Sequence, residues 1–183
     1  MDILNEVQSL INNSERKITQ CEPEGIIVDN WIRLLNKPGD GINGVSYEEL
    51  SGLSVVAIDI IGGIFAMNIT RFDPGKKDIW YFAPDTLEWE CMEVQYEDFL
   101  TWVFRGNIEK FYGTMRWQDW EKDCESATFY QGVLIYPFLW AKECDVETAS
   151  QKTVPMDEII QLNFEIRSKI SDKDKSIKID WET

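Results

Sequence analysis

The apolar positions of the chain switch between a period of two and a helical period, and the clearest period-two region lies near the middle. Two apolar stretches, "SVVAIDII" at 54–61 and "IFAMNIT" at 64–70, are separated only by Gly62 and Gly63. Runs of this length and composition are typical of strands, and glycine accepts the positive φ angles of a tight turn. The pattern therefore predicts a β-hairpin.

A second hairpin is predicted directly after the first. "IWYFA" at 79–83 and "LEWECMEV" at 87–94 have strand character, and a Pro-Asp pair favours a turn between them. Because side chains alternate along a strand, Glu88 and Glu90 are expected to face water, opposite Trp89.

The same criteria divide the rest of the chain. Helical spacing and end signals predict helices at 3–11, 96–105, 108–115 and 155–169. Strands are predicted at 25–35, before Pro137 within 129–140, and at the edge segment 177–181. Loops are predicted at 36–44 and 143–152.

Together these elements predict an α+β fold in a single domain, residues 1–183. The sheet is expected to be an antiparallel meander of about four to six strands, with helices packed on one side. The charged segment 171–183 is expected to form a flexible tail, because few of its side chains can be buried.

The chain is strongly acidic, with 33 Asp and Glu against 18 Lys and Arg and a formal net charge of −15. Such a charge repels phosphate backbones and steers basic partners toward the surface. We therefore expect no nucleic-acid partner and consider a basic protein the favoured class.

Histidine is absent from the sequence, which excludes Ser-His and Cys-His catalytic pairs and His-ligated metal sites. No Cys-x-x-Cys spacing indicates zinc, so no cofactor is expected. Each of the four cysteines is expected to be a small buried hydrophobe: Cys21, Cys91, Cys124 and Cys144.

The first residues, "MDILNEVQSL", are acidic where a signal peptide needs basic residues. No stretch reaches the roughly 18 apolar residues of a membrane span. These observations predict a cytoplasmic protein that is not associated with a membrane.

Gly39, Gly41 and Gly44 follow the G-x-G-x-x-G spacing of dinucleotide-binding loops. Asp40 lies inside the loop, where its charge would repel phosphate, and no alternation of strands and long helices follows. A flexible connection is therefore favoured over a nucleotide site.

Several long aromatic motifs resemble a bacterial family of uncharacterised proteins, domain of unknown function 2625. The resemblance covers roughly 25–165 and rests on "VVAIDIIGGIFAMN", "IWYFAPDTLEWE", "YEDFLTWVFRGN", "FYGTMRWQDW" and "YPFLWAKE". More loosely, the order of elements in 54–104 is similar to the SUKH superfamily, known for cell-wall synthesis regulators and immunity proteins. That second resemblance implies a mixed α+β fold and a protein-binding role, and supplies no catalytic residues.

The leading hypothesis is a non-enzymatic binding module, immunity-like in function, whose acidic surface engages a basic protein. The residues expected to form that surface are Asp85, Glu88, Glu90 and Asp119.

Two alternatives come from other classes. A hydrolase or glycan-acting enzyme can work with carboxylates alone, and its candidate residues are Asp59, Asp85, Glu88 and Glu90. A homo-oligomer or scaffold would instead bury part of the Trp-rich helical region around Trp117 and Trp120. Convergence of two carboxylates in a pocket, one of them buried, would favour the enzyme.

Overall fold

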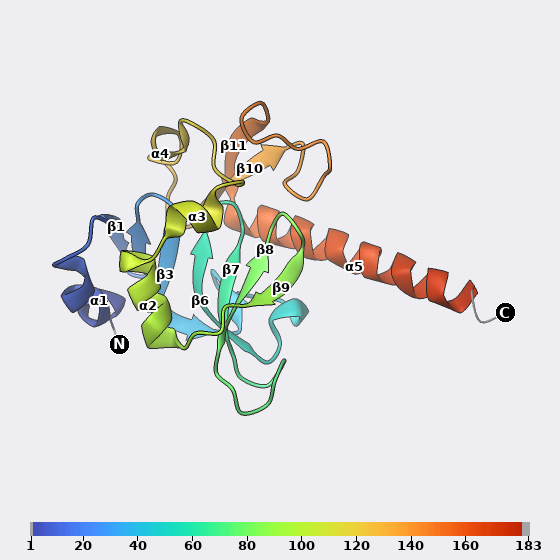
Figure 1. Ribbon diagram of the computed structural model, residues 1–183, viewed down its shortest axis with the longest axis horizontal. Coiled ribbons are helices and arrows are strands. Elements are labelled where there is room, and N and C mark those ends of the chain that lie inside the picture. The colour runs from blue at the N-terminus through green and yellow to red at the C-terminus, as the bar shows by residue number, and fades with distance from the viewer. Residues whose placement is uncertain (1, 181–183) are drawn as a thin grey trace.

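The computed structural model of the protein describes the backbone of residues 2–180 and the side chains of residues 2–171. Its main element is one antiparallel sheet of seven strands in the order β1-β2-β3-β6-β7-β8-β9 (Figure 1). These strands are β1 Ile18–Glu22, β2 Gly25–Val28, β3 Ile32–Gly39, β6 Leu53–Asp59, β7 Ile64–Asn68, β8 Ile79–Ala83 and β9 Glu88–Cys91. The predicted α+β meander is confirmed, with more strands than expected.

Two small two-stranded sheets complete the β-structure. They pair β4 Gly41–Ile42 with β5 Val45–Ser46, and β10 Gln131–Tyr136 with β11 Ser150–Pro155. The helices are α1 Ile3–Ile11, α2 Tyr96–Arg105, α3 Ile108–Tyr112, α4 Trp120–Asp123 and α5 Met156–Asp180, with a 3₁₀ turn at Glu48–Leu50. The predicted starts of α2 and α3 are confirmed, and Asn107 caps α3 by accepting a hydrogen bond from the Lys110 N–H at 2.9 Å.

The strand predicted at 25–35 is in fact a hairpin. Asp29 and Asn30 have φ angles of 50° and 59°, and the Trp31 N–H donates to the Val28 carbonyl at 2.9 Å. This is the geometry of a type I′ turn, whose left-handed positions Asp and Asn tolerate better than most residues. The turn separates β2 from β3, which raises the strand count.

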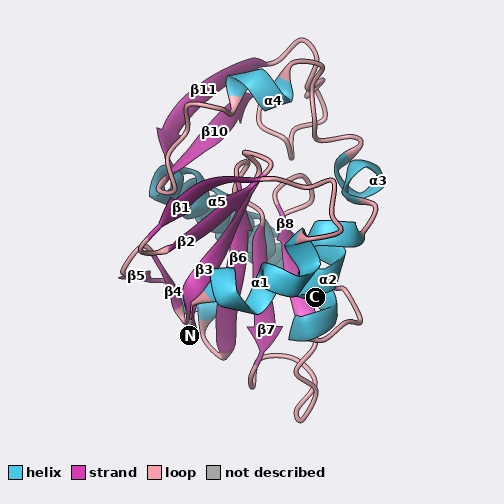
Figure 2. Cartoon of the chain, turned by 90° about the vertical axis from the view of Figure 1, so that its left-hand side faces the viewer, coloured by secondary structure: helices cyan, strands magenta, loops and turns pink. Residues whose placement is uncertain are grey.

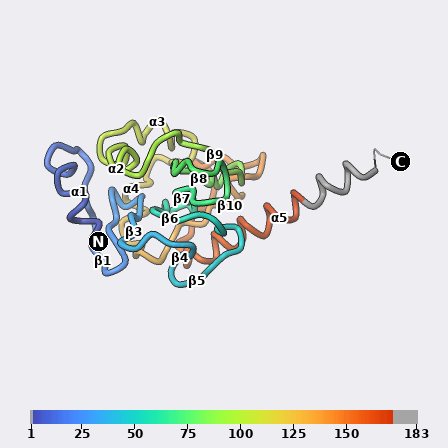
Figure 3. The backbone as a smooth tube through the Cα atoms, turned by 90° about the horizontal axis from the view of Figure 1, so that it is seen from below, coloured from blue at the N-terminus to red at the C-terminus, as the bar shows by residue number. Residues whose placement is uncertain are grey.

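Both faces of the sheet are covered. On one face, Phe65 and Tyr81 belong to an apolar cluster that includes residues of α1, α2 and α3. On the other face, Phe82 belongs to a cluster that includes Ile160 of α5. Figure 2 and Figure 3 show the sheet between these two layers. The expectation that helices pack on one side of the sheet therefore holds for α1–α3. It is wrong for α5, which covers the opposite face.

The C-terminal half departs most from prediction. Segment 143–152, predicted to be a loop, ends in β11, which pairs with β10 through Leu134 and Lys152. The prediction of an edge strand at 177–181 is wrong for residues 177–180, because α5 continues to Asp180. Residue 181 lies outside the described residues. The flexible tail stays a prediction.

The helices can be compared with what a bilayer requires. Within the described residues, none combines the length and the apolar content needed to cross a membrane.

Candidate functional site

The predicted carboxylates of the second hairpin lie at one border of the sheet. Phe82 pairs with Trp89 in register, and their rings pack at 5.4 Å, facing α5. Glu88 and Glu90 are exposed, and Asp85 lies half-buried in the turn between β8 and β9. The prediction that the two glutamates face water is confirmed.

Few cations neutralise this border. Arg167 of α5 places Nη2 at 3.4 Å from Glu88 Oε2, but the Glu88 side chain is 67% exposed. A pair so open to water contributes little. Among the described side chains, no ion pair involves Glu90. Most of the negative charge on β9 therefore remains available to a partner.

The backbone of β9 is equally open. β9 is the last strand of the sheet, and the Met92 N–H donates to the Ile79 carbonyl at 2.9 Å. Because inward and outward hydrogen-bonding groups alternate along an antiparallel strand, Trp89 and Cys91 direct their N–H and C=O groups away from β8. Within the part of the chain that the structure describes, β9 thus offers an unpaired edge.

Asp119 does not join this site. It is exposed and precedes α4 without capping it by a side-chain hydrogen bond. Figure 1 places α4 beside the β10–β11 sheet and away from β9. The four residues predicted to form one acidic surface therefore divide into a group of three and a separate Asp119.

Asp59, the additional candidate of the enzyme hypothesis, is buried with a relative exposure of 0%. Its Oδ2 accepts hydrogen bonds from the hydroxyls of Tyr81 at 2.7 Å and Tyr112 at 2.9 Å. Its Oδ1 accepts from the backbone N–H groups of Gly63 at 2.7 Å and Ile61 at 3.2 Å. Asp59 therefore has a full set of partners inside the core.

This environment separates Asp59 from the other candidates. Burial raises its pKa above the ordinary value, although all four hydrogen bonds act in the opposite direction. Asp85 is half-buried in a turn, and Glu88 and Glu90 are exposed, so the structure brings none of them into a pocket with Asp59. The convergence that would favour carboxylate catalysis does not occur among these residues.

The tryptophans considered for an oligomer interface largely pack within the chain. Trp117 is buried, and the ring of Trp120 contacts that of Trp31 at 5.1 Å. The guanidinium of Arg116 lies 3.9 Å from the Trp120 ring centroid and 4.4 Å from that of Trp31. The rings of Trp120 and Trp31 therefore already contact a cation of the same chain, Arg116. The oligomeric state stays a prediction.

The cysteines do not all match their predicted burial. Cys124 is buried and Cys144 is half-buried, but Cys21 and Cys91 are exposed. The reason is their place on β1 and β9, the two outer strands of the sheet, where a side chain is covered less. The expectation is wrong for these two residues.

Thiol reactivity should follow this division. In native buffer, Ellman's reagent is expected to modify Cys21 and Cys91 rapidly and Cys144 more slowly. Cys124 should react only after unfolding, because it is buried and its pKa is raised to about 12 by that burial. The absorbance of the released thionitrobenzoate measures the fast and slow phases of modification. The double variant Cys21→Ser/Cys91→Ser should lose the fast phase. Fast modification of all four thiols would contradict the structure.

The glycine-rich segment forms part of a pocket instead of a phosphate loop. β4 and β5 make a hairpin in which Asn43 and Gly44 have φ angles of 52° and 79°, again a type I′ turn. The only helical element that follows closely is the three-residue turn Glu48–Leu50. The flexible connection predicted here is therefore mostly strand: Gly39 ends β3, Gly41 begins β4, and Gly44 serves the tight turn.

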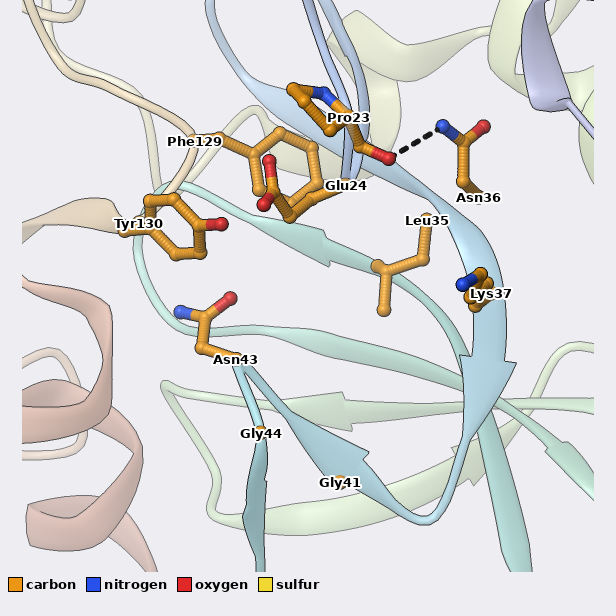
Figure 4. Close-up of a pocket in the computed structure, with 10 residues that line it drawn as sticks. All are labelled: Pro23, Glu24, Leu35, Asn36, Lys37, Gly41, Asn43, Gly44, Phe129 and Tyr130. Carbon is orange, nitrogen blue, oxygen red and sulfur yellow. Dashed lines mark hydrogen bonds between the residues drawn. The ribbon is translucent and has the colours of Figure 1, made fainter.

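The pocket beside this hairpin has a volume of about 470 Å³. Figure 4 shows its walls, which come from the β1–β2 turn, β3, the β4–β5 hairpin and the segment that precedes β10. The lining residues are Pro23, Glu24, Leu35, Asn36, Lys37, Gly41, Asn43, Gly44, Phe129 and Tyr130. Sequence reasoning missed this site, because its residues come from four separate segments.

Comparisons with known proteins agree with the family-level resemblance. A family described as "Protein of unknown function DUF2625" matches residues 21–159. The chain is 30% identical to the uncharacterized protein YbfG of Escherichia coli over 151 residues, which cover 78% of this chain and 69% of that protein. It is 28% identical to an uncharacterized protein of Haemophilus influenzae over 116 residues, 63% of this chain and 51% of that protein. No solved structure matches.

Proposed function

The chain belongs to the family of proteins of unknown function DUF2625, and for this member we propose a non-enzymatic role in which β9 binds a basic segment of a partner protein. The observation that carries the proposal is the combination found on β9. An unpaired strand edge lies beside the exposed carboxylates of Glu88 and Glu90.

An open edge can bind an extended peptide as an additional strand. The outward N–H and C=O groups of Trp89 and Cys91 would supply backbone hydrogen bonds, which give affinity with little sequence preference. Selectivity must then come from side chains that flank the added strand.

The carboxylates supply that selectivity. Asp85, Glu88, Glu90 and Glu93 place negative charge along the hairpin, and the whole chain carries −15. A basic segment is attracted and its rate of association rises, whereas an acidic segment is repelled. The same charges oppose pairing between two copies of β9, because charged edge residues discourage edge-to-edge association. The acidic edge thus favours a basic partner over a second copy of itself.

Two further features are part of this proposal. All four cysteines are free thiols, which supports a cytoplasmic location, where thiols stay reduced. The similarity of element order to the SUKH superfamily, which stays a sequence-level expectation, suggests an immunity-like version in which the partner is a basic toxin.

Charge reversal on β9 should therefore abolish most of the binding. The double variant Glu88→Lys/Glu90→Lys is expected to weaken binding of an extended peptide of alternating lysine and threonine roughly tenfold or more. Isothermal titration calorimetry at low salt measures the affinity, and NMR shifts in residues 88–93 locate the peptide. The milder variant Glu88→Gln/Glu90→Gln should lie between wild type and the reversal, which guards against an effect of the Lys side chain on Arg167.

The matched control is Glu125→Lys/Glu143→Lys, which makes the same change in net charge at two exposed positions elsewhere. It should change the affinity less than about twofold. Equal weakening by both double variants would mean that overall charge, and not β9, attracts the peptide. Wild type, Glu88→Lys/Glu90→Lys and Glu125→Lys/Glu143→Lys can then serve as baits in a lysate, and a natural partner should be lost only from Glu88→Lys/Glu90→Lys.

A further inference from the structure

The pocket of Figure 4 combines an apolar wall with a few polar groups, the usual composition of a small-molecule site. Leu35 and Phe129 provide carbon surface, and Phe129 is itself only 4% exposed. Tyr130 is 43% exposed, its ring packs against that of Phe129 with the centroids 6.0 Å apart, and its hydroxyl is hydrogen-bonded to the Glu24 carboxylate. In Figure 4 its hydroxyl points into the pocket, and the Asn43 amide extends from the β4–β5 turn toward it.

One end of the pocket is negative. The carboxylate of Glu24 is the main cause of a raised pKa at Tyr130, and Glu22 adds to the effect. The phenol therefore stays neutral, and its ring faces the pocket next to a carboxylate. A carboxylate beside an exposed aromatic ring is an arrangement that attracts cations, through charge and through the ring face.

The other end carries a positive charge. Lys37 of β3 lines the pocket on the side away from Tyr130 (Figure 4). Asn36, at the same end as Lys37 in Figure 4, is already engaged: its Nδ2 donates to the Pro23 carbonyl at 2.9 Å, and its Oδ1 accepts from the Ile3 N–H at 2.9 Å. A cationic ligand would be repelled at the Lys37 end, and its charged group would be directed to Glu24.

The wall made by the β4–β5 hairpin is fixed by close packing. A side chain at Gly41 would place its Cβ at 2.7 Å from the Val45 carbonyl oxygen, so the two strands approach as only glycine allows. The hairpin wall of the pocket is therefore in place before any ligand enters, and a wall that needs no ordering lowers the entropic cost of binding.

We propose that this pocket binds a small organic cation, an alkylguanidinium or alkylammonium, with its head between Glu24 and Tyr130 and its apolar stem on Leu35 and Phe129. The site lies at β3 and the β4–β5 hairpin, and β9 is at the border of the sheet beyond β8, so the inference is independent of the function proposed for β9.

The experiment uses n-butylguanidinium and its neutral isostere n-butylurea as probes of the full chain. Titration followed by ¹H–¹⁵N NMR should show millimolar binding of the cation, with shifts concentrated at residues 24, 35, 43, 44 and 130. The urea should bind about fivefold or more weakly, because it has the same stem without the charge. Binding should be unchanged in Glu88→Lys/Glu90→Lys, which separates this result from the fate of the β9 proposal.

Three substitutions test the assigned roles. Glu24→Gln and Tyr130→Ala should each weaken n-butylguanidinium about fivefold, and Lys37→Ala should strengthen it about twofold. The control Glu143→Gln removes one exposed carboxylate elsewhere and should leave the affinity unchanged. The inference is overturned if the urea binds as well as the cation, if Glu24→Gln and Glu143→Gln act alike, or if 50 mM of the cation, about fifty times a millimolar dissociation constant, leaves the pocket residues unshifted.

Discussion

Replacing Asp59 with alanine is expected to lower the free energy of unfolding by about 3–5 kcal/mol. The substitution removes the acceptor of four hydrogen bonds at once, those from Tyr81, Tyr112, Gly63 and Ile61. These donors lie in the core, where an unsatisfied polar group costs far more than an average hydrogen bond contributes. Urea unfolding followed by tryptophan fluorescence measures the change.

Two variants separate the polar network from the volume of the side chain. Asp59→Asn keeps the shape and can still bond all four groups, since the tyrosine hydroxyls also accept, so it should cost less than Asp59→Ala. Glu90→Ala removes an exposed carboxylate from β9 and should stay within about 0.5 kcal/mol of wild type. An Asp59→Ala protein as stable as Glu90→Ala would show that the network contributes nothing.

The difference in unfolding free energy between wild type and Asp59→Asn should also change with pH, in a direction that the pKa of Asp59 determines. Burial raises the pKa of Asp59 in the folded state above its ordinary value of 3.8. The folded protein therefore binds a proton at the Asp59 carboxyl group more tightly than the unfolded chain does. The contribution of Asp59 to stability must then fall as pH rises from about 3.8 through the folded pKa. Unfolding of both proteins at several pH values should show wild type losing stability relative to Asp59→Asn as pH rises.

How much of this fold could be predicted depends on how local its signals are. The hairpin β6–β7 and the pair β8–β9 were predictable, because turn residues and alternating strands lie within a few positions of each other. The β2–β3 turn was missed because Asp29 and Asn30 lack the glycine that usually marks a type I′ turn. β11 was missed because its residues are polar, with only Val154 buried, and its partner β10 lies across a connection of more than a dozen residues.

The candidate sites show the same limit. Exposure of Glu88 and Glu90 followed from alternation alone, which needs no knowledge of distant residues. Asp59 was grouped with them because its donors Tyr81 and Tyr112 are 22 and 53 positions away. A signal was present nonetheless: an acidic residue within an otherwise apolar run, shortly before two glycines, has to find buried partners. The pocket near Tyr130 had no such signal.

The second glycine of that pair leads to the other large effect, because Gly63→Ala is expected to destabilise the protein by about 3 kcal/mol. Gly63 has no positive φ, so the reason is space: a Cβ there would overlap Asp59 Oδ2 and the Tyr81 hydroxyl. The close approach that forbids a side chain is the same one that lets the Gly63 N–H donate to Asp59 at 2.7 Å. Thermal and urea unfolding measure the loss.

The control is Gly39→Ala, since Gly39 also has no positive φ and a Cβ there would meet no atom within 4 Å. Its stability should stay within about 0.5 kcal/mol of wild type, or rise slightly, because alanine restricts the unfolded chain more than glycine does. A double-mutant cycle adds the decisive test. If Gly63→Ala acts through the Asp59 network, its cost should shrink in the Asp59→Ala background, where the colliding carboxylate is gone. Additive costs would instead assign the effect of Gly63→Ala to the collision with Tyr81, which remains when the carboxylate is removed, and the glycine and the buried carboxylate would then be two independent features of the same hairpin.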